Sequence, residues 1–214
     1  MRIILVLLLM LPVESLFGIS QKHKENDKSF AESLESMSIP DEFKLKEVIL
    51  GNKNAPNTVI MYFSSTCQSC REFHEKELPT FIKKYVDTGV TKVYLRPYLD
   101  DLGSLESSIL VICFGGNSGE KILTLYKKIF ERQKSWLGSQ DPAKFLRKMF
   151  IDFGYNKTEI EKCIGNTRIS AGLMKEQQRS MLKFKVAMVP TFIVNGKIHR
   201  GMLTCQKIAA MFAK

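Results

Sequence analysis

The sequence predicts an α/β protein whose sheet-forming part is interrupted by a block of helices. A strand, a helix and a second strand are expected first, residues 104–183 carry almost no strand signal, and a short hairpin and a helix follow. Each sheet-forming part is too small to bury a core alone. One sheet built from both parts therefore explains this order better than two tandem domains.

The composition is that of a soluble globular protein. The chain has 214 residues, of which 44% are apolar and 25% are charged, enough for one domain that carries an insertion. The net charge is +10, but the basic residues are spread along the chain without a dense Lys/Arg block. We therefore expect no nucleic-acid partner.

The first residues have the pattern of a signal peptide, which we place at 1–20. Arg2 precedes the unbroken apolar run from Ile3 to Leu11, and the small residues Gly18 and Ser20 offer a cleavage site. The apolar run is much shorter than the roughly 20 residues that span a bilayer. We expect export, with an uncleaved N-terminal membrane anchor as the alternative.

Local patterns give the expected elements in chain order. The apolar run Val59–Phe63 predicts a central strand buried on both faces, and Pro79 should kink the helix that follows it. Asn195-Gly196 is a strong hairpin signal between two short strands. Strands are expected at 45–50, 58–63, 92–99, 191–194 and 197–200, and helices at 67–86, 104–114, 119–134, 141–153, 157–164, 167–182 and 204–213.

These elements define four parts after the signal peptide. The boundaries are 21–44 for a linker with a short helix, 45–103 for the first sheet-forming part, 104–183 for the helical insertion and 184–214 for the second sheet-forming part.

Two cysteines three residues apart, in the stretch SSTCQSCR, follow the apolar strand directly. By themselves Cys67 and Cys70 are compatible with a metal site, a structural disulfide or a redox pair. Because the pair opens a helix, Cys67 should lie at or beside its N-cap, where free backbone N–H groups and the helix dipole favour a thiolate. We expect Cys67 to exchange disulfides with a substrate and the less exposed Cys70 to resolve the mixed disulfide.

A second feature is the proline that opens the returning strand, in the run Val189-Pro190-Thr191. Proline cannot donate a hydrogen bond to a strand ladder, and it is tolerated where the chain turns sharply, often as a cis peptide. Taken alone, Pro190 is equally an ordinary strand-entry proline.

Together these residues resemble the thioredoxin-fold disulfide oxidoreductases, specifically the DsbA-like branch with a helical insertion. The resemblance covers about residues 45–203. The motifs that carry it are Val59–Phe63 leading into Cys67-Gln68-Ser69-Cys70, Phe73–Pro79, Tyr85–Gly89, Trp136 just past the 119–134 helix, and Val189–Gly196.

The resemblance implies a periplasmic thiol:disulfide oxidase without a cofactor or a metal. Pro190 is then cis and packs against the Cys67–Cys70 pair, and the backbone of Val189 binds an extended substrate segment. Valine at position 189 is similar to the residue that the oxidases of the family carry there, whereas isomerases and reductases more often carry threonine. The implied partners are reduced or unfolded exported proteins and a DsbB-like, quinone-linked membrane reoxidase. A monomer is expected.

Three positions depart from the family pattern. Gln68 and Ser69 replace the Pro-His pair of strong oxidants, so a milder oxidant is expected. Met61 stands where relatives often keep a buried acid. His74 stands where some relatives carry glutamate, and it either assists proton transfer or is a partly exposed histidine on the helix surface.

The remaining cysteines are Cys113, Cys163 and Cys205. Because related proteins often have a second disulfide in the inserted block, a structural Cys113–Cys163 bridge is expected, with buried free thiols as the alternative. A bridge closing about fifty residues contributes roughly 3–4 kcal/mol. Cys205 is expected to be a free, buried thiol.

Three other functions compete with the oxidase. A disulfide isomerase or reductase of the same fold would use the same Cys67–Cys70 pair. A metal-binding module would use Cys67, Cys70 and His74, although a second ligand cluster is missing from the sequence. A non-catalytic chaperone would not need Cys67.

Overall fold

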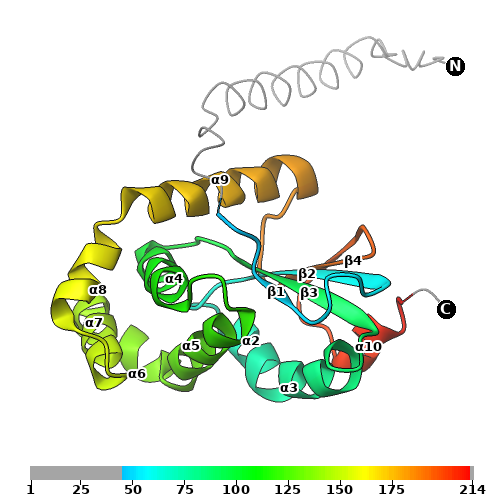
Figure 1. Ribbon diagram of the computed structural model, residues 1–214, viewed down its shortest axis with the longest axis horizontal. Coiled ribbons are helices and arrows are strands. Elements are labelled where there is room, and N and C mark those ends of the chain that lie inside the picture. The colour runs from blue at the N-terminus through cyan, green and yellow to red at the C-terminus, as the bar shows by residue number, and fades with distance from the viewer. Residues whose placement is uncertain (1–44, 213–214) are drawn as a thin grey trace, which may run out of the picture. The chain divides into compact units, whose positions relative to one another are not determined.

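The computed structural model describes residues 45–212, so the expected signal peptide (1–20) and linker with a short helix (21–44) lie outside the described residues. Figure 1 shows one twisted sheet with helices on both faces. The strands are β1 (Ile49–Leu50), β2 (Asn57–Phe63), β3 (Thr91–Pro97), β4 (Thr191–Val194) and β5 (Lys197–Arg200). Their order is β1-β3-β2-β4-β5, so strands from the two ends of the chain form one sheet.

The central strand β2 pairs in parallel with β3 and antiparallel with β4. Val59, Met61 and Phe63 are buried on one face, while Tyr62 is buried on the other with Val186 and Ile193. The prediction of a strand buried on both faces is therefore confirmed for its carboxyl end. That end leads directly into the Cys67–Cys70 segment. The strand expected at 45–50 is shorter, since only Ile49 and Leu50 pair with β3.

The helix expected over 67–86 is present, but it has two wide turns. It consists of α2 (Gln68–Glu72), the π-helical turn η2 (Phe73–Glu77), α3 (Leu78–Phe81) and the π-helical turn η3 (Ile82–Val86). Leu78 N–H bonds to the carbonyl of Phe73, five residues back. Because Pro79 has no N–H and its ring clashes with the carbonyl four residues earlier, a wide turn at this point accommodates it.

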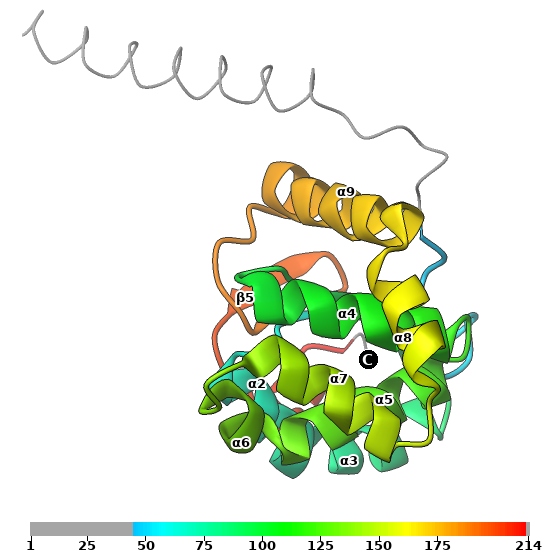
Figure 2. The same cartoon turned by 90° about the vertical axis from the view of Figure 1, so that its left-hand side faces the viewer.

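The inserted block lies between β3 and β4 and is helical throughout. It consists of α4 (Leu102–Gly115), α5 (Gly119–Glu131), α6 (Gln133–Leu137), α7 (Pro142–Asp152), α8 (Lys157–Ile164) and α9 (Thr167–Phe184). The helix expected at 119–134 breaks at Arg132, so Trp136 lies inside the short helix α6 rather than past a helix end. Figure 2 shows α4 running through the middle of the block, between α9 and α7.

Helix α9 covers the Tyr62 face of the sheet. The Tyr62 hydroxyl lies 2.9 Å from Glu176 Oε1 on α9 and accepts a hydrogen bond from Arg96 on β3. Arg96 also bonds Glu47 through two nitrogens. This partly buried network joins the sheet to the last helix of the insertion. The chain then returns through β4 and β5 to α10 (Cys205–Ala209), where Cys205 is free and 2% exposed.

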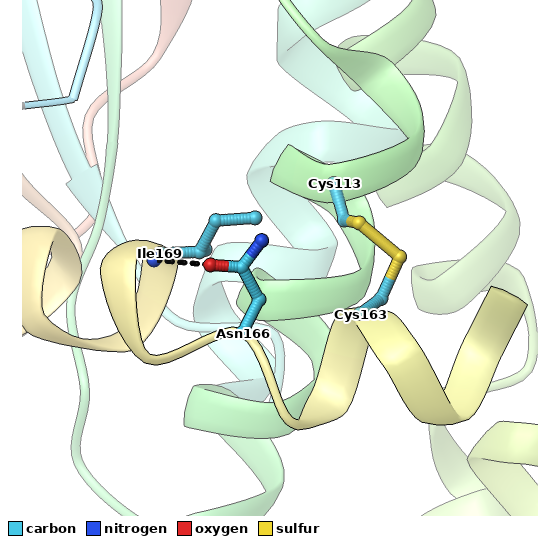
Figure 3. The surroundings of a disulfide bond; sticks show 4 residues. All are labelled: Cys113, Cys163, Asn166 and Ile169. Atoms are coloured by element: carbon cyan, nitrogen blue, oxygen red, sulfur yellow. Dashed lines mark hydrogen bonds between the residues drawn. A yellow bond between two sulfur atoms is a disulfide. The ribbon is translucent and has the colours of Figure 1, made fainter.

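A disulfide joins Cys113 on α4 to Cys163 on α8, as Figure 3 shows. Three residues after Cys163, Asn166 N-caps α9 by accepting the Ile169 N–H at 3.1 Å. The disulfide therefore ties the first helix of the insertion to the segment from which α9 starts. Among the helices of residues 45–212, none is both long and apolar enough to cross a bilayer.

We predict that this disulfide contributes about 3–4 kcal/mol to the free energy of unfolding, because it closes a loop of 50 residues in the unfolded chain. The measurement is urea unfolding with and without reductant in a Cys67→Ser, Cys70→Ser background, where the reagent does not act on the other cysteine pair. In a matched variant that also carries Cys113→Ala and Cys163→Ala, reductant should have no effect. Equal stability of the first variant with and without reductant would contradict the prediction.

Candidate active site

The Cys67–Cys70 segment begins where β2 ends and α2 starts. Cys67 is the N-cap of α2, with φ −77° and ψ 122°, and its sulfur accepts the backbone N–H of Cys70 at 3.2 Å. The N-cap position expected from the sequence is therefore confirmed. An N-cap residue in extended conformation directs its side chain at the free N–H groups of the first turn. Here that side chain is a thiol.

Hydrogen bonds to the sulfur of Cys67 favour its thiolate form. The Cys70 thiol, the Ser69 hydroxyl at 3.2 Å and the Cys70 backbone N–H together lower the pKa of Cys67 from 9.0 to about 6, although partial burial and the carboxylate of Asp100 act in the opposite direction. Cys70 is fully buried, and burial raises the pKa of its thiol. The two cysteines thus differ as expected: Cys67 is half-buried and thiolate-forming, and Cys70 is shielded and protonated.

The returning strand brings Val189 to the same sulfur. The Val189 carbonyl oxygen lies 3.7 Å from Cys67 Sγ and accepts its S–H when the thiol is protonated. The Val189–Pro190 peptide bond is cis. Pro190 is buried, and its carbonyl accepts the Gly201 N–H at 2.8 Å, which ties this turn to the segment after β5.

Two methionines leave apolar surface exposed beside this turn. Met188 immediately precedes Val189 and is 48% exposed, and Met202 immediately follows Gly201 and is 41% exposed. Flexible, polarizable methionine side chains suit binding of varied polypeptides. Met188 and Met202 therefore give the surface beside the Val189–Pro190 turn an exposed apolar character.

Residues that follow β3 hold the loop that precedes Cys67. Asp100 accepts hydrogen bonds from the hydroxyls of Ser64 and Thr66, and the hydroxyls of Ser65 and Ser107 lie 2.6 Å apart. These contacts were not among the sequence predictions. The sequence could have placed Asp100 near this loop, because Asp100 follows β3 and the carboxyl ends of the parallel strands β2 and β3 meet at one edge of the sheet.

Gln133 is a further residue that sequence reasoning missed. It is the first residue of α6 and is 3% exposed, and its amide nitrogen donates to the carbonyls of Ser65 at 2.7 Å and of Cys67 at 3.0 Å. No local pattern marks this glutamine, since the contact depends on how the insertion folds back onto β2.

Gln68 and His74 are not among the residues that hydrogen-bond the sulfur of Cys67. Gln68 is exposed, and its amide bonds to Glu72 at 3.0 Å. The expectation of a partly exposed His74 is wrong: its ring is 5% exposed, it packs against Phe63 and Phe130, and its Nε2 has no hydrogen-bond partner. Burial lowers the pKa of His74 to about 3, so the imidazole is neutral. Its helix face points into the core because η2 packs against α5 of the insertion.

A metal site would need three or more ligands. Within residues 45–212, no group of three or more His, Cys, Asp or Glu side chains is arranged to hold a metal ion. Cys67, Cys70 and His74 therefore do not form the ligand cluster that the metal-binding alternative needs.

The family model described as Thioredoxin matches residues 44–213. A Rickettsia prowazekii protein provisionally named a protein-disulfide oxidoreductase is 27% identical over 150 residues, which are 70% of this chain and 54% of that protein. The chain thus spans about half the length of the curated relatives it matches first.

Two solved structures have the same fold. A DsbA of Wolbachia pipientis superposes with a TM-score of 0.70 at 21% identity, covering 79% of this chain and 92% of that chain. A protein-disulfide isomerase of Novosphingobium aromaticivorans superposes with a TM-score of 0.67 at 18% identity, covering 77% and 96%. The expected thioredoxin fold with an inserted helical domain is therefore confirmed.

We predict that Cys67 titrates with a midpoint near pH 6 in the reduced protein. Cys70→Ala should raise this pKa most, because the Cys70 thiol is the strongest of the hydrogen-bond donors to the sulfur, and Ser69→Ala should raise it less. The measurement is thiolate absorbance near 240 nm during a pH titration. A midpoint near 9 in the unsubstituted protein, or a larger shift in Ser69→Ala than in Cys70→Ala, would refute this assignment.

A second prediction concerns His74 and acid stability. The folded pKa is about 3 and the unfolded value is 6.5, so between these pH values the unfolded chain binds more protons than the folded chain. The free energy of unfolding should therefore fall as the pH is lowered from 6.5 toward 3. His74→Leu, of similar volume, should lose less stability over that range in urea unfolding. Parallel pH profiles for the two proteins would show that His74 is not buried in its neutral form.

Proposed function

Because the chain belongs to the thioredoxin family and has the DsbA-like helical insertion, we propose that it is a periplasmic thiol:disulfide oxidase for exported proteins. The observation that carries the proposal is the half-buried Cys67 sulfur, which accepts the Cys70 N–H and has a pKa lowered to about 6. A stable thiolate is a good leaving group, and it stabilises the reduced form that an oxidase ends in.

The proposed cycle starts from the Cys67–Cys70 disulfide, and the structure describes the dithiol that ends it. A substrate thiolate attacks Cys67 Sγ, the Cys67–Cys70 bond breaks, and Cys70 leaves and takes up a proton. A second substrate thiolate then attacks the substrate sulfur of the mixed disulfide and expels Cys67 as a thiolate. The substrate loses two electrons and the cysteine pair gains them.

Val189 and Pro190 are proposed to bind the substrate. The turn at Val189 lies beside the Cys67 sulfur, and an extended substrate segment pairing with the Val189 backbone would bring its own sulfur to that point. Met188 and Met202, both exposed beside this turn, offer apolar contacts. Substrates are proposed to be reduced or unfolded exported proteins, which expose apolar side chains and free thiols together.

The chain is proposed to be exported, and its Cys67–Cys70 dithiol is proposed to be reoxidised by a partner. The apolar run of residues 3–11 supports a signal peptide, and an N-terminal anchor is the alternative. Return of the dithiol to the disulfide requires an oxidant, proposed to be a DsbB-like, quinone-linked membrane protein. The chain is proposed to act as a monomer.

A second candidate is a disulfide isomerase or reductase, which the Gln68-Ser69 pair favours. Ser69 supplies a neutral hydroxyl to the sulfur and Gln68 bonds Glu72 instead, so no cation between the cysteines adds to thiolate stability. A weaker oxidant would transfer its disulfide less completely and would favour exchange within substrates.

The reduction potential of Cys67–Cys70, measured by equilibration with glutathione, separates the two directions. We expect a value between the roughly −270 mV of thioredoxin and the roughly −120 mV of the strongest dithiol oxidants. Cys67→Ser should abolish oxidation of a reduced, unfolded protein. A potential near that of thioredoxin would favour a reductase instead, and full function of Cys67→Ala in cells would favour a non-catalytic chaperone.

A further inference from the structure

Gln133 connects the helical insertion to the backbone of the reactive cysteine. Its side chain leaves the start of α6 and is 3% exposed. One amide nitrogen carries two N–H groups, and the two carbonyl oxygens within its reach are those of Ser65 at 2.7 Å and Cys67 at 3.0 Å. The amide thus bridges two peptide groups of the loop between β2 and α2.

The direction of the Cys67 carbonyl depends on the ψ angle of Cys67. The contact between the Cys67 sulfur and the Cys70 N–H depends on the same angle. Rotation about ψ of Cys67 turns this carbonyl and the following N–H groups together, relative to the side chain. At ψ 122° the sulfur accepts the Cys70 N–H at 3.2 Å and the carbonyl accepts the Gln133 amide. A helical ψ near −42° would turn the carbonyl away from Gln133 and remove the N-cap geometry.

The other hydrogen bonds that residues after β3 make to this loop do not reach Cys67. Asp100 bonds the side chains of Ser64 and Thr66, and Ser107 bonds the side chain of Ser65. Those contacts position the loop before the cysteine, whereas the Gln133 contact is made to the backbone of the cysteine itself. The Cys67 carbonyl also accepts the Arg71 N–H at 3.1 Å, a bond that belongs to α2 and moves with it.

The geometry points to Gln133 as a positioning residue, whose amide holds the backbone of Cys67 in the extended N-cap conformation from which the sulfur accepts the Cys70 N–H. This inference rests on the proposed exchange at Cys67 but not on its direction, since oxidase and reductase alike use the thiolate. The insertion thereby contributes to the reactivity of a cysteine that belongs to the sheet-forming part.

The side-chain chemistry specifies the variants. Gln133→Met has nearly the same length without a donor, and Gln133→Glu places a carboxylate against two carbonyl oxygens. Gln133→Asn retains the amide but is one methylene shorter and does not reach both carbonyls. All three variants should lose the hydrogen bond to the Cys67 carbonyl. Gln133→Asn is the variant that keeps the buried site polar and uncharged.

The test is the Cys67 pKa, from thiolate absorbance, together with the equilibrium constant against glutathione, on the full chain. In Gln133→Met and Gln133→Asn we expect the pKa of Cys67 to rise by about half a unit or more. The equilibrium constant for oxidising glutathione should fall by roughly threefold for each half unit. In Gln133→Glu the rise should be larger, because a nearby carboxylate adds to the field of Asp100.

The matched control is Tyr126→Phe on α5. Tyr126 is 1% exposed and its hydroxyl bonds Ser108, so this change removes a buried hydrogen bond within the insertion that is not made to the loop, and it keeps the ring that packs against Phe63. It should lower the melting temperature without moving the Cys67 pKa. The inference is overturned if folded Gln133→Asn or Gln133→Met keeps the pKa of the unsubstituted protein, or if Tyr126→Phe shifts it equally. Activity of Cys67→Ser would instead overturn the proposed exchange.

Discussion

The hydrogen bond from the Cys70 backbone N–H to the sulfur of Cys67 is the contact on which the rest of the site depends. It exists only because a buried strand ends and a helix begins within a few residues, with Cys67 as the N-cap. The same geometry puts Cys70 on the buried side of the first turn. One local backbone arrangement therefore makes the two chemically identical side chains different, one a half-buried thiolate and the other a shielded thiol.

Two distant parts of the chain complete this arrangement. From the insertion, Gln133 bonds the backbone carbonyl of Cys67, and from the returning strand, Val189 places its carbonyl beside the sulfur. The insertion sits between β3 and β4 in sequence, so its helices lie against the end of the sheet where the cysteines are. It covers the loop and leaves the Val189 side open, where the exposed Met188 lies.

The groups that stabilise the thiolate are neutral. The Cys70 thiol, the Ser69 hydroxyl and a backbone N–H lower the pKa of Cys67, whereas partial burial and the carboxylate of Asp100 oppose them. His74 supplies no cation, since burial keeps its imidazole neutral in the aromatic core. Met61 is likewise in the core, at 1% exposure. Such a site stabilises the reduced form less than one with a cation between the cysteines, which is the physical reason for proposing a mild oxidant.

The sequence by itself determined the order of elements, the helical insertion, the N-cap role of Cys67 and the shielding of Cys70. These follow from short-range patterns: apolar runs, turn residues and the position of a cysteine at a helix start. Only the tertiary structure decided the contact with Gln133, and the contact with Val189 was expected from the family resemblance rather than from any local pattern, because these residues lie 66 and 122 residues from Cys67 along the chain. The burial of His74 was also decided by the tertiary structure. Helical spacing predicts which face of a helix a side chain is on, but it does not predict which neighbouring helix covers that face. What covers each face depends on how the insertion folds back, and no local pattern carries that information.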